Sequence, residues 1–252
     1  MNEIFQRPEV THFHDTSVPY AEEYGRETPE GFSFRIRREK VLAMLPDGEG
    51  KKILDLASGP GTMIKDLRAR GYAVTCVDAA PGMIEIAKKV AGDDPMVTCE
   101  VGDAYALRFD SGTFDAVTAT GLIEYLVDER KFLAEVARVV KTNGIAIITV
   151  PNVWSPWRLW NRVLRVGLRL FKNQSNGLLH REYTLRRVKS LLRDHGFKPE
   201  GVAYYNVKLV PLPFDRMFPT FTARFTGACE WLSNTPLKFL ATGFIVRATK
   251  KG

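Results

Sequence analysis

The sequence lacks the marks of membrane-spanning, secreted and zinc-binding proteins. No uncharged stretch reaches the roughly 18 residues that a spanning helix needs, and the N-terminal MNEIFQRPEV lacks the apolar core of a signal peptide. The three cysteines, Cys76, Cys99 and Cys229, form no C-x-x-C pair and have no neighbouring histidine at ligand spacing. We therefore expect a cytoplasmic protein with reduced thiols and no structural zinc site.

The composition also excludes a disordered chain. Of the 252 residues, 45% are hydrophobic and 26% are charged, which is typical of one large globular domain. The net charge of +7 is unevenly placed, because residues 154–198 contain eleven lysines or arginines and only two acidic residues. This segment carries +9 and the rest of the chain −2. A partner that recognises positive charge is therefore expected at residues 154–198.

Short apolar, β-rich runs alternate with helical patterns from residue 51 to residue 151. The strands are expected at ILDLA, AVTCVD, MVTCEV, FDAVTAT and IAIITV. This alternation predicts an α/β domain of parallel βαβ units with helices on both faces of the sheet. Elsewhere we expect helices over residues 34–45 and 184–195 and from Ser155 onward, and strands near 202–210 and 239–248.

Three strand ends carry residues that suit a nucleotide. The first strand leads into ASGPG, where glycines let a ligand lie against amides at a helix N-terminus, although a tight turn alone would also explain them. The second strand ends at Asp78, about twenty residues on, where a carboxylate can accept both ribose hydroxyls. The third ends at Asp103-Ala104, where a side-chain acceptor and a backbone N–H can meet an adenine edge.

Taken in order, these segments resemble the class I S-adenosylmethionine-dependent methyltransferases. The matching motifs are ILDLASGPG, VDAAPGMIEIAKK, GDA, FDAVTATGLIEYL and LAEVARVVKTNGIAIITVPN. The resemblance implies a Rossmann-like, doubly wound, mostly parallel seven-stranded sheet. It also implies an N-terminal helical lid over residues 1–45, a cofactor-binding core over 46–152, a basic amphipathic insertion over 153–183, and a C-terminal completion of the sheet over 184–252.

The resemblance assigns roles to individual residues around S-adenosylmethionine. Gly59 and Gly61 would admit its methionine portion, with Asp55 nearby, and Asp78 would hold the ribose. The adenine would lie among Ala79, Met83, Asp103 and Ala104, and the pocket would be closed by Gly121 and Leu122. Ala57 departs from the family, which usually has glycine there; we expect its methyl group to be tolerated if its φ angle is negative.

The nearest likeness within the family is to the ubiquinone-biosynthesis O-methyltransferases and related lipid-modifying enzymes. The arginine that contacts the cofactor carboxylate in that group matches Arg37, although a solvated charge on a basic helix explains Arg37 equally well. The group's magnesium ligands, two glutamates and a histidine, match Gly121, Glu124 and Tyr125. Because two of the three ligands are missing, we expect no metal, and a catechol-type acceptor loses its support.

Methyl transfer from a sulfonium is an in-line displacement that rests on positioning, with a base needed only when the acceptor must lose a proton. The candidate bases are His180, which lies just before the expected N-cap Thr184, and Tyr125 after the fourth strand. His12 and His14 in the lid are further candidates. The alternative for His180 is a surface histidine among cations.

The helix that begins at Ser155-Pro156 has a basic face and an apolar face. Its cations and two tryptophans could contact an anionic membrane at the inner face of the cell membrane; the residues are Trp157, Arg158, Trp160, Arg162, Arg165 and Arg169. Alternatively, the apolar face roofs the acceptor pocket and the cations are solvated.

These observations predict S-adenosylmethionine-dependent methylation of a small hydrophobic acceptor, at oxygen. Two other functions remain open. One is a nucleic-acid methyltransferase whose basic segment follows phosphates, which is disfavoured because no N/D-P-P-Y/F motif follows the fourth strand. The other is a non-catalytic protein that uses the cofactor fold for binding at a membrane surface. The oligomeric state is left open.

Overall fold

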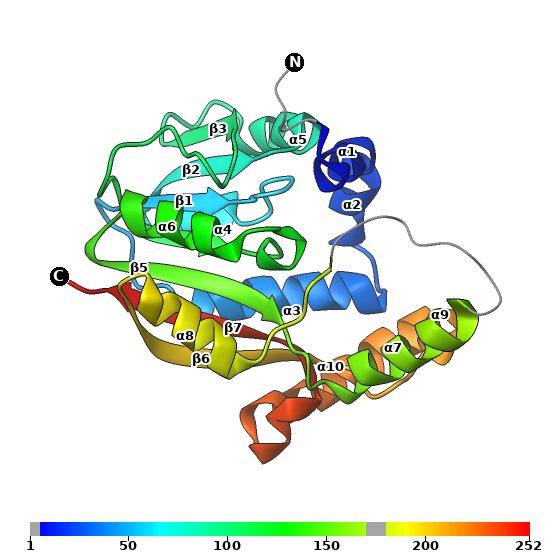
Figure 1. Cartoon of the computed structure of the whole chain (residues 1–252). Helices are drawn as coiled ribbons and strands as arrows, with labels where there is room; N and C mark the ends of the chain where they lie inside the picture. Colours follow the sequence, from blue (N-terminus) through cyan, green and yellow to red (C-terminus); the bar gives the residue numbers. More distant parts are fainter. Residues whose placement is uncertain (1–5, 170–179) are drawn as a thin grey trace.

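A computed structural model describes residues 6–169 and 180–252, which form a seven-stranded sheet in the order β3-β2-β1-β4-β5-β7-β6 (Figure 1). β1 to β5 are parallel to one another, and β7 is antiparallel to both β5 and β6. The strands are β1 (Lys52–Leu56), β2 (Ala73–Asp78), β3 (Val97–Val101), β4 (Phe114–Ala119), β5 (Val140–Pro151), β6 (Phe197–Val207) and β7 (Ala241–Lys250). The predicted Rossmann-like sheet is confirmed.

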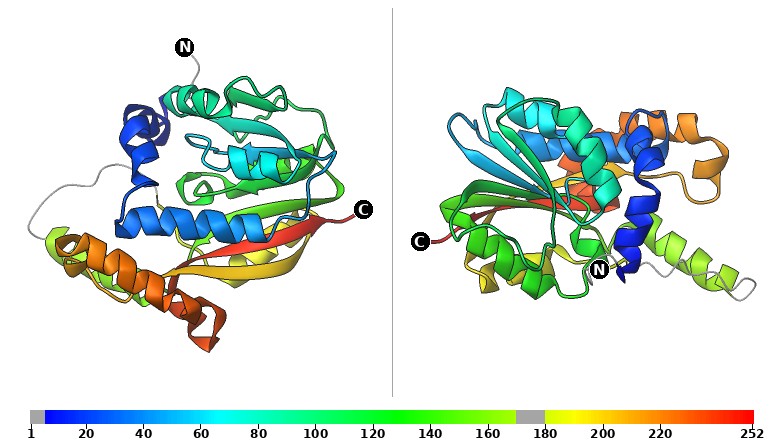
Figure 2. Two further views of the ribbon diagram at one scale, coloured as in Figure 1. Left: turned by 180° about the vertical axis from the view of Figure 1, so that it is seen from behind. Right: turned by 90° about the horizontal axis from the view of Figure 1, so that it is seen from above.

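Helices cover both faces of the sheet, which explains why its central strands are apolar throughout. One face is packed by α6 and α8, and the other by α3, α4 and α5 (Figures 1 and 2). These helices are α3 (Pro29–Ala43), α4 (Ile64–Ala69), α5 (Pro81–Ala91), α6 (Glu129–Val139) and α8 (Leu185–Asp194). Asp128 caps α6, and Thr184 caps α8 as expected, its side chain accepting from the Arg187 amide.

Two further groups of helices lie at the edge of the sheet where the parallel strands end. The first group consists of α1 (Pro8–Asp15), α2 (Ser17–Glu23) and the short helix η2 (Ile123–Tyr125), which comes directly after β4 in the chain. The second, which we call the projection, extends past β6 and β7 (Figure 2). It contains α7 (Pro156–Arg169), α9 (Phe214–Met217), α10 (Pro219–Cys229), η3 (Glu230–Asn234) and η4 (Pro236–Leu240).

The N-terminal region differs from the predicted lid of 45 residues. The helix expected over residues 34–45 begins earlier, at Pro29, because the Thr28 side chain accepts from the Gly31 amide and caps it. This helix buries Val41 and Leu42 against the sheet. It therefore belongs to the covering layer of the fold, and only α1 and α2 lie over the ends of the strands. Within the ranges described, no helix is both long and apolar enough to cross a bilayer.

Candidate active site

A pocket with about 760 Å³ of empty space lies where β1, β2, β3 and β4 end, beneath α1 and α2. The loops after these strands form its floor, and Val10, Phe13 and Tyr20 of the two short helices form its outer wall. Nine of the predicted site residues line it: Gly59, Asp78, Ala79, Met83, Asp103, Ala104, Gly121, Leu122 and Tyr125.

The two glycines of the first loop have different tasks. Gly59 has φ of +55°, and a Cβ added there would meet nothing nearer than Tyr20 Cε1 at 3.9 Å, so its backbone is open to the pocket. Gly61 does not line the pocket: at φ of +75°, its Cβ would lie 2.6 Å from Ile64 Cδ1 and 3.1 Å from Ala87. The expectation that Gly61 admits the cofactor is therefore corrected, because this glycine serves the packing of the loop against α5.

Ala57 adopts a backbone conformation that we did not expect. Its φ is +56°, in the left-handed region that favours glycine, so the condition under which we expected its methyl group to be tolerated is not met. The turn between β1 and the glycine loop imposes this angle at the position where the family usually has glycine. Ala57 thus lines the pocket at a cost in backbone strain.

Asp78 joins the first two strand ends. Its Oδ2 accepts from the Gly59 amide at 2.8 Å, and its Oδ1 accepts from the Ala80 amide at 2.9 Å. Burial raises the pKa of Asp78, while these backbone bonds act in the opposite direction. Each oxygen of an ionised carboxylate can accept more than one hydrogen bond, so both retain capacity for a ligand in the pocket.

Asp55 lies below the pocket rather than in its lining. The Thr118 hydroxyl donates to Asp55 Oδ1 at 2.8 Å, while Oδ2 is buried without a hydrogen-bond partner among the residues described. Burial, supported by the charge of Asp78, raises the pKa of Asp55 to about 7. Asp55 therefore takes up a proton near neutral pH.

Arg7, which the sequence analysis did not single out, binds the predicted adenine acceptor. The Arg7 guanidinium holds both oxygens of Asp103, at 2.7 and 3.1 Å, and lies over the Tyr105 ring at 5.0 Å from its centroid. The Tyr105 amide donates to Asp103 Oδ1 at 3.0 Å, so only Oδ2 retains open acceptor capacity. Because Arg7 directly precedes α1, this contact fastens the lid to the floor of the pocket.

A second contact holds the lid at α5. The Gly82 amide donates to His14 Nδ1 at 3.0 Å, which assigns His14 to anchoring α1 and not to the acceptor side. A Cβ at Gly82 would lie 2.9 Å from the His14 carbonyl oxygen, so the lid approaches α5 as closely as a glycine allows.

Aromatic rings also line the pocket. Phe13 packs edge-on against Tyr20 at 5.8 Å and against Tyr125 at 5.3 Å between ring centroids. His180 packs edge-on against the other side of Tyr125 at 5.7 Å but does not line the pocket itself. Burial is the main cause that raises the pKa of Tyr125 to about 12, and the charge of Glu124 adds to it, so this phenol stays protonated at neutral pH and can act as a hydrogen-bond donor.

Behind this wall lie two buried charges. Arg37 packs against Gly121, where a Cβ would meet its guanidinium nitrogen at 2.8 Å, and its side chain reaches the Tyr24 hydroxyl at 3.5 Å. Glu124 is 7% exposed, and its Oε2 has no hydrogen-bond partner in the described part of the chain. Burial raises the pKa of Glu124, although Arg37 and Arg158 act against this. The buried position of Arg37 disfavours the alternative of a solvated charge.

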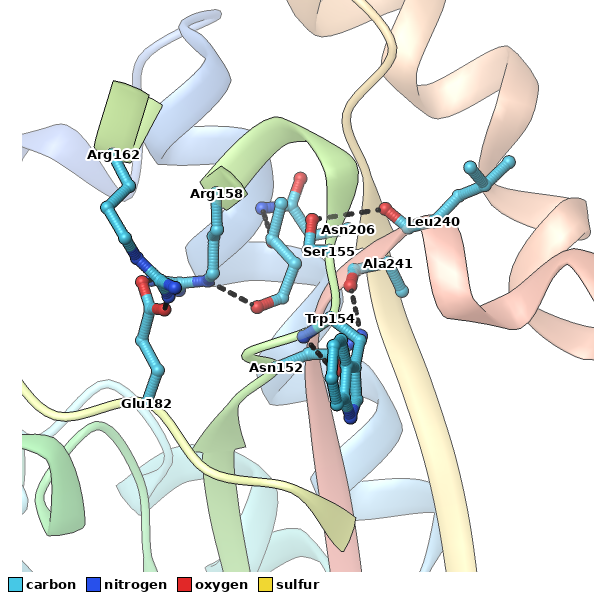
Figure 3. A network of polar contacts seen from close by, with 10 residues as sticks. Asn152, Trp154, Ser155, Arg158, Arg162, Glu182, Asn206, Leu240 and Ala241 are labelled. Carbon is cyan, nitrogen blue, oxygen red and sulfur yellow. Dashed lines mark hydrogen bonds and ion pairs between the residues drawn. The ribbon is translucent and has the colours of Figure 1, made fainter. Parts of the chain in front are cut away.

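The first two arginines of α7 are held by one carboxylate, with Arg158 partly buried and Arg162 exposed. Glu182, in the chain leading to α8, pairs with both Arg158 and Arg162, and Arg158 Nε donates to the Thr242 carbonyl at 2.7 Å (Figure 3). The Trp157 ring lies under Lys208 Nζ at 4.5 Å, whereas Trp160 is 47% exposed. The buried carboxylate of Glu182 thus orients α7 through its ion pairs with Arg158 and Arg162. Arg165 and Arg169 lie outside the described side chains.

Comparison with known proteins gives the family. Residues 54–148 match the methyltransferase domain family. The demethylmenaquinone methyltransferase of Streptomyces avermitilis is 35% identical over 173 residues, which are 68% of this chain and 65% of that protein. The mitochondrial ubiquinone biosynthesis O-methyltransferase of Schizosaccharomyces pombe is 36% identical over 104 residues, 40% of this chain and 38% of that protein.

The similarity in fold to a solved structure extends over almost the whole chain. The methyltransferase in complex with the Haloferax volcanii Trm112 methyltransferase activator superposes with a TM-score of 0.67 at 20% identity, over 95% of this chain and 98% of that one. The chain belongs to the S-adenosylmethionine-dependent methyltransferases. It spans less than two thirds of the length of the curated relatives named above.

The residues present fit the cofactor of this methyltransferase family. The backbone at Gly59 is open where a side chain would fill the cradle, and Asp55 Oδ2 at the end of β1 is a buried acceptor with no hydrogen-bond partner among residues 6–169 and 180–252. Asp78 and Asp103 keep acceptor capacity at the ends of β2 and β3. The adenine end would therefore lie beneath Arg7 and the methionine end beside Gly121, in front of Arg37. The cofactor contacts of individual residues remain predictions.

Proposed function

We propose that this protein transfers a methyl group from S-adenosylmethionine to an oxygen atom of a small hydrophobic acceptor. The observation that carries the proposal is the mixed lining of one pocket. The carboxylates of Asp78 and Asp103 and the open backbone at Gly59 line it together with the rings of Phe13, Tyr20 and Tyr125. The names of the quinone-pathway relatives also support a lipophilic acceptor.

The proposed mechanism rests mainly on positioning. S-adenosylmethionine supplies, when bound, a methyl group on a sulfonium sulfur, which is a good leaving group. Asp78 and the Gly59 backbone hold the nucleoside side of the pocket, and Arg37 lies where it can neutralise a carboxylate behind Gly121. Phe13 and Tyr20 exclude water from the acceptor end, which favours an in-line approach of the acceptor oxygen.

The acceptor proton requires a separate group. Tyr125 with its pKa of about 12 is a hydrogen-bond donor, and we infer that it orients the acceptor oxygen instead of deprotonating it. His180, in edge contact with Tyr125 but outside the pocket lining, remains our candidate for the proton acceptor, a role that requires its imidazole to reach the acceptor hydroxyl when the substrate is bound. A His180→Ala protein is expected to lose the acid limb of the pH–rate profile. An unchanged acid limb with wild-type activity would remove His180 from the mechanism.

A small acceptor is preferred to a nucleic acid because of the ion pairs of α7. Arg158 and Arg162 share the Glu182 carboxylate, so they are less free to follow a phosphate backbone. The three cysteines are free thiols, which supports our placement of the protein in a reducing, cytoplasmic compartment.

Two measurements test the proposal. Isothermal calorimetry with S-adenosylhomocysteine should show at least tenfold weaker binding to Asp78→Ala, because a charged hydrogen-bond acceptor contributes about 1.5–3 kcal/mol. Glu85→Ala, an exposed carboxylate on α5, serves as the matched control and should bind as the wild type does. Incubation with a tritium-labelled methyl donor and a panel of hydrophobic phenols, carboxylic acids and amines should label a phenol or acid. Cofactor binding without any labelled product would favour a non-catalytic role.

A further inference from the structure

Exposed large apolar side chains are concentrated in the projection. The described residues expose sixteen such side chains, and thirteen of them lie between residues 154 and 239. The most exposed of these thirteen residues have relative accessibilities of 62–66%; they are Trp154, Val163, Met217, Phe221 and Trp231. Scattered single apolar residues need no explanation, but a gathering of this kind marks an interaction surface.

These side chains belong to a connected part of the molecule. Trp160 Nε1 donates to the Leu212 carbonyl at 3.0 Å, which ties α7 to the segment before α9. Phe221 and Phe225 stack on the outside of α10, with 5.9 Å between their ring centroids. In Figure 2 both α7 and α10 extend beyond the end of the sheet.

The charges of the projection are sorted by sign. Its acidic residues between 209 and 240 are Asp215 and Glu230, which are only 2% and 9% exposed. Arg216 and Arg224, by contrast, are exposed, and Arg224 makes one surface ion pair with Glu27 at 3.2 Å. The described part of α7 has no acidic residue at all. The outer face of the projection is therefore apolar and positively charged.

We propose that the projection docks on the surface of an anionic lipid bilayer. Aromatic rings with flanking arginines are the side chains that bind the interface between headgroups and acyl chains, and the arginines favour anionic lipid. A second copy of the chain would present the same positive charge and be repelled. Binding depends on the rings of α9 and α10 more than on Arg158 and Arg162, whose charges are paired with Glu182.

The position of this surface suits an acceptor that is dissolved in the membrane. α7 follows the carboxyl end of β5, at the sheet edge where the cofactor pocket and α1–α2 also lie (Figure 1). The proposal stands apart from methyl transfer, because docking requires no turnover.

Co-sedimentation with vesicles tests the docking surface. The full-length protein is mixed with phosphatidylcholine vesicles that contain or lack phosphatidylglycerol. The double variant Phe218→Ser/Phe221→Ser is expected to bind the anionic vesicles at least about tenfold more weakly, since two large apolar side chains leave the interface. The matched control is Met96→Ser/Val127→Ser, which removes two exposed apolar side chains outside the projection and should bind as the wild type does.

A charge variant tests the electrostatic contribution to vesicle binding. Arg216→Glu/Arg224→Glu should lose the preference for anionic vesicles, while Lys65→Glu/Lys89→Glu, with the same change in net charge, should retain it. Far-UV circular dichroism and S-adenosylhomocysteine calorimetry confirm that each variant is folded with an intact cofactor site. Absence of wild-type binding to anionic vesicles, or equal binding by Phe218→Ser/Phe221→Ser, overturns the proposal. So does a dimer in light scattering that the same double variant dissociates, because a second copy then covers the surface.

Discussion

Ala57 offers a direct test of the strain in the cofactor loop. A residue with a Cβ in the left-handed region costs about 1–2 kcal/mol, and Ala57 has φ of +56°. Glycine removes this cost but loses more conformational entropy on folding, about 0.4–1 kcal/mol. The Ala57→Gly protein is therefore expected to be more stable than the wild type by about 0.5–1 kcal/mol. For a domain of this size the melting temperature should rise by roughly 2 °C.

The measurement is thermal unfolding without ligand, followed by circular dichroism, together with urea unfolding at 25 °C. Ala119→Gly is the control, because Ala119 is a buried residue of β4 paired with Leu56 in extended backbone. A glycine at position 119 relieves no left-handed backbone angle and leaves a small void in the core. The free energy of unfolding should therefore fall by about 1–2 kcal/mol. If Ala57→Gly lowers the melting temperature as Ala119→Gly does, the loop stores no strain and our interpretation of the turn is wrong.

Three further predictions concern the same pocket. Arg7→Gln should weaken S-adenosylhomocysteine binding about fivefold, since a partly exposed bidentate ion pair contributes about 1 kcal/mol; tighter binding would instead show that Arg7 competes with adenine for Asp103. The raised pKa of Asp55, about 7, means that the folded state disfavours its ionised form. The free energy of unfolding should therefore fall as the pH rises from about 4 to about 7, and Asp55→Asn should flatten this slope in pH-dependent urea titrations; an equal slope in both proteins would contradict the shift. Gly61→Ala should lower the melting temperature, whereas Gly59→Ala should leave it within a few degrees and weaken S-adenosylhomocysteine binding in calorimetry; the opposite pattern would reverse their assigned tasks.

Local pattern was sufficient to predict the sheet and the floor of the pocket. Asp78 and Asp103 end apolar strands, and strands that run parallel end at one edge, so their meeting follows from the sequence. The side chains that bind these carboxylates could not be predicted from the same pattern. Asp103 is held by Arg7 from ninety-six positions earlier in the chain, and no periodicity near either residue indicates such a contact.

The orientation of α7 shows a second limit. A helical wheel separates an arginine face from an apolar face, but it does not say which of them the protein covers. The position of Glu182 decides this, because a side chain only 9% exposed needs positive partners and takes Arg158 and Arg162. The apolar Trp160 is left at the surface. The angle at Ala57 was also beyond prediction, since the turn as a whole sets it.

The lid has a consequence for the order of binding. Phe13 and Tyr20, which face the acceptor end, belong to the same two short helices that Arg7 fastens to Asp103 at the adenine end. The acceptor wall is thus completed by the contact that closes over the cofactor. If the proposed methyl transfer takes place here, we expect exchange of the two ligands to be coupled, with S-adenosylmethionine entering before the acceptor, and product-inhibition kinetics would test this order.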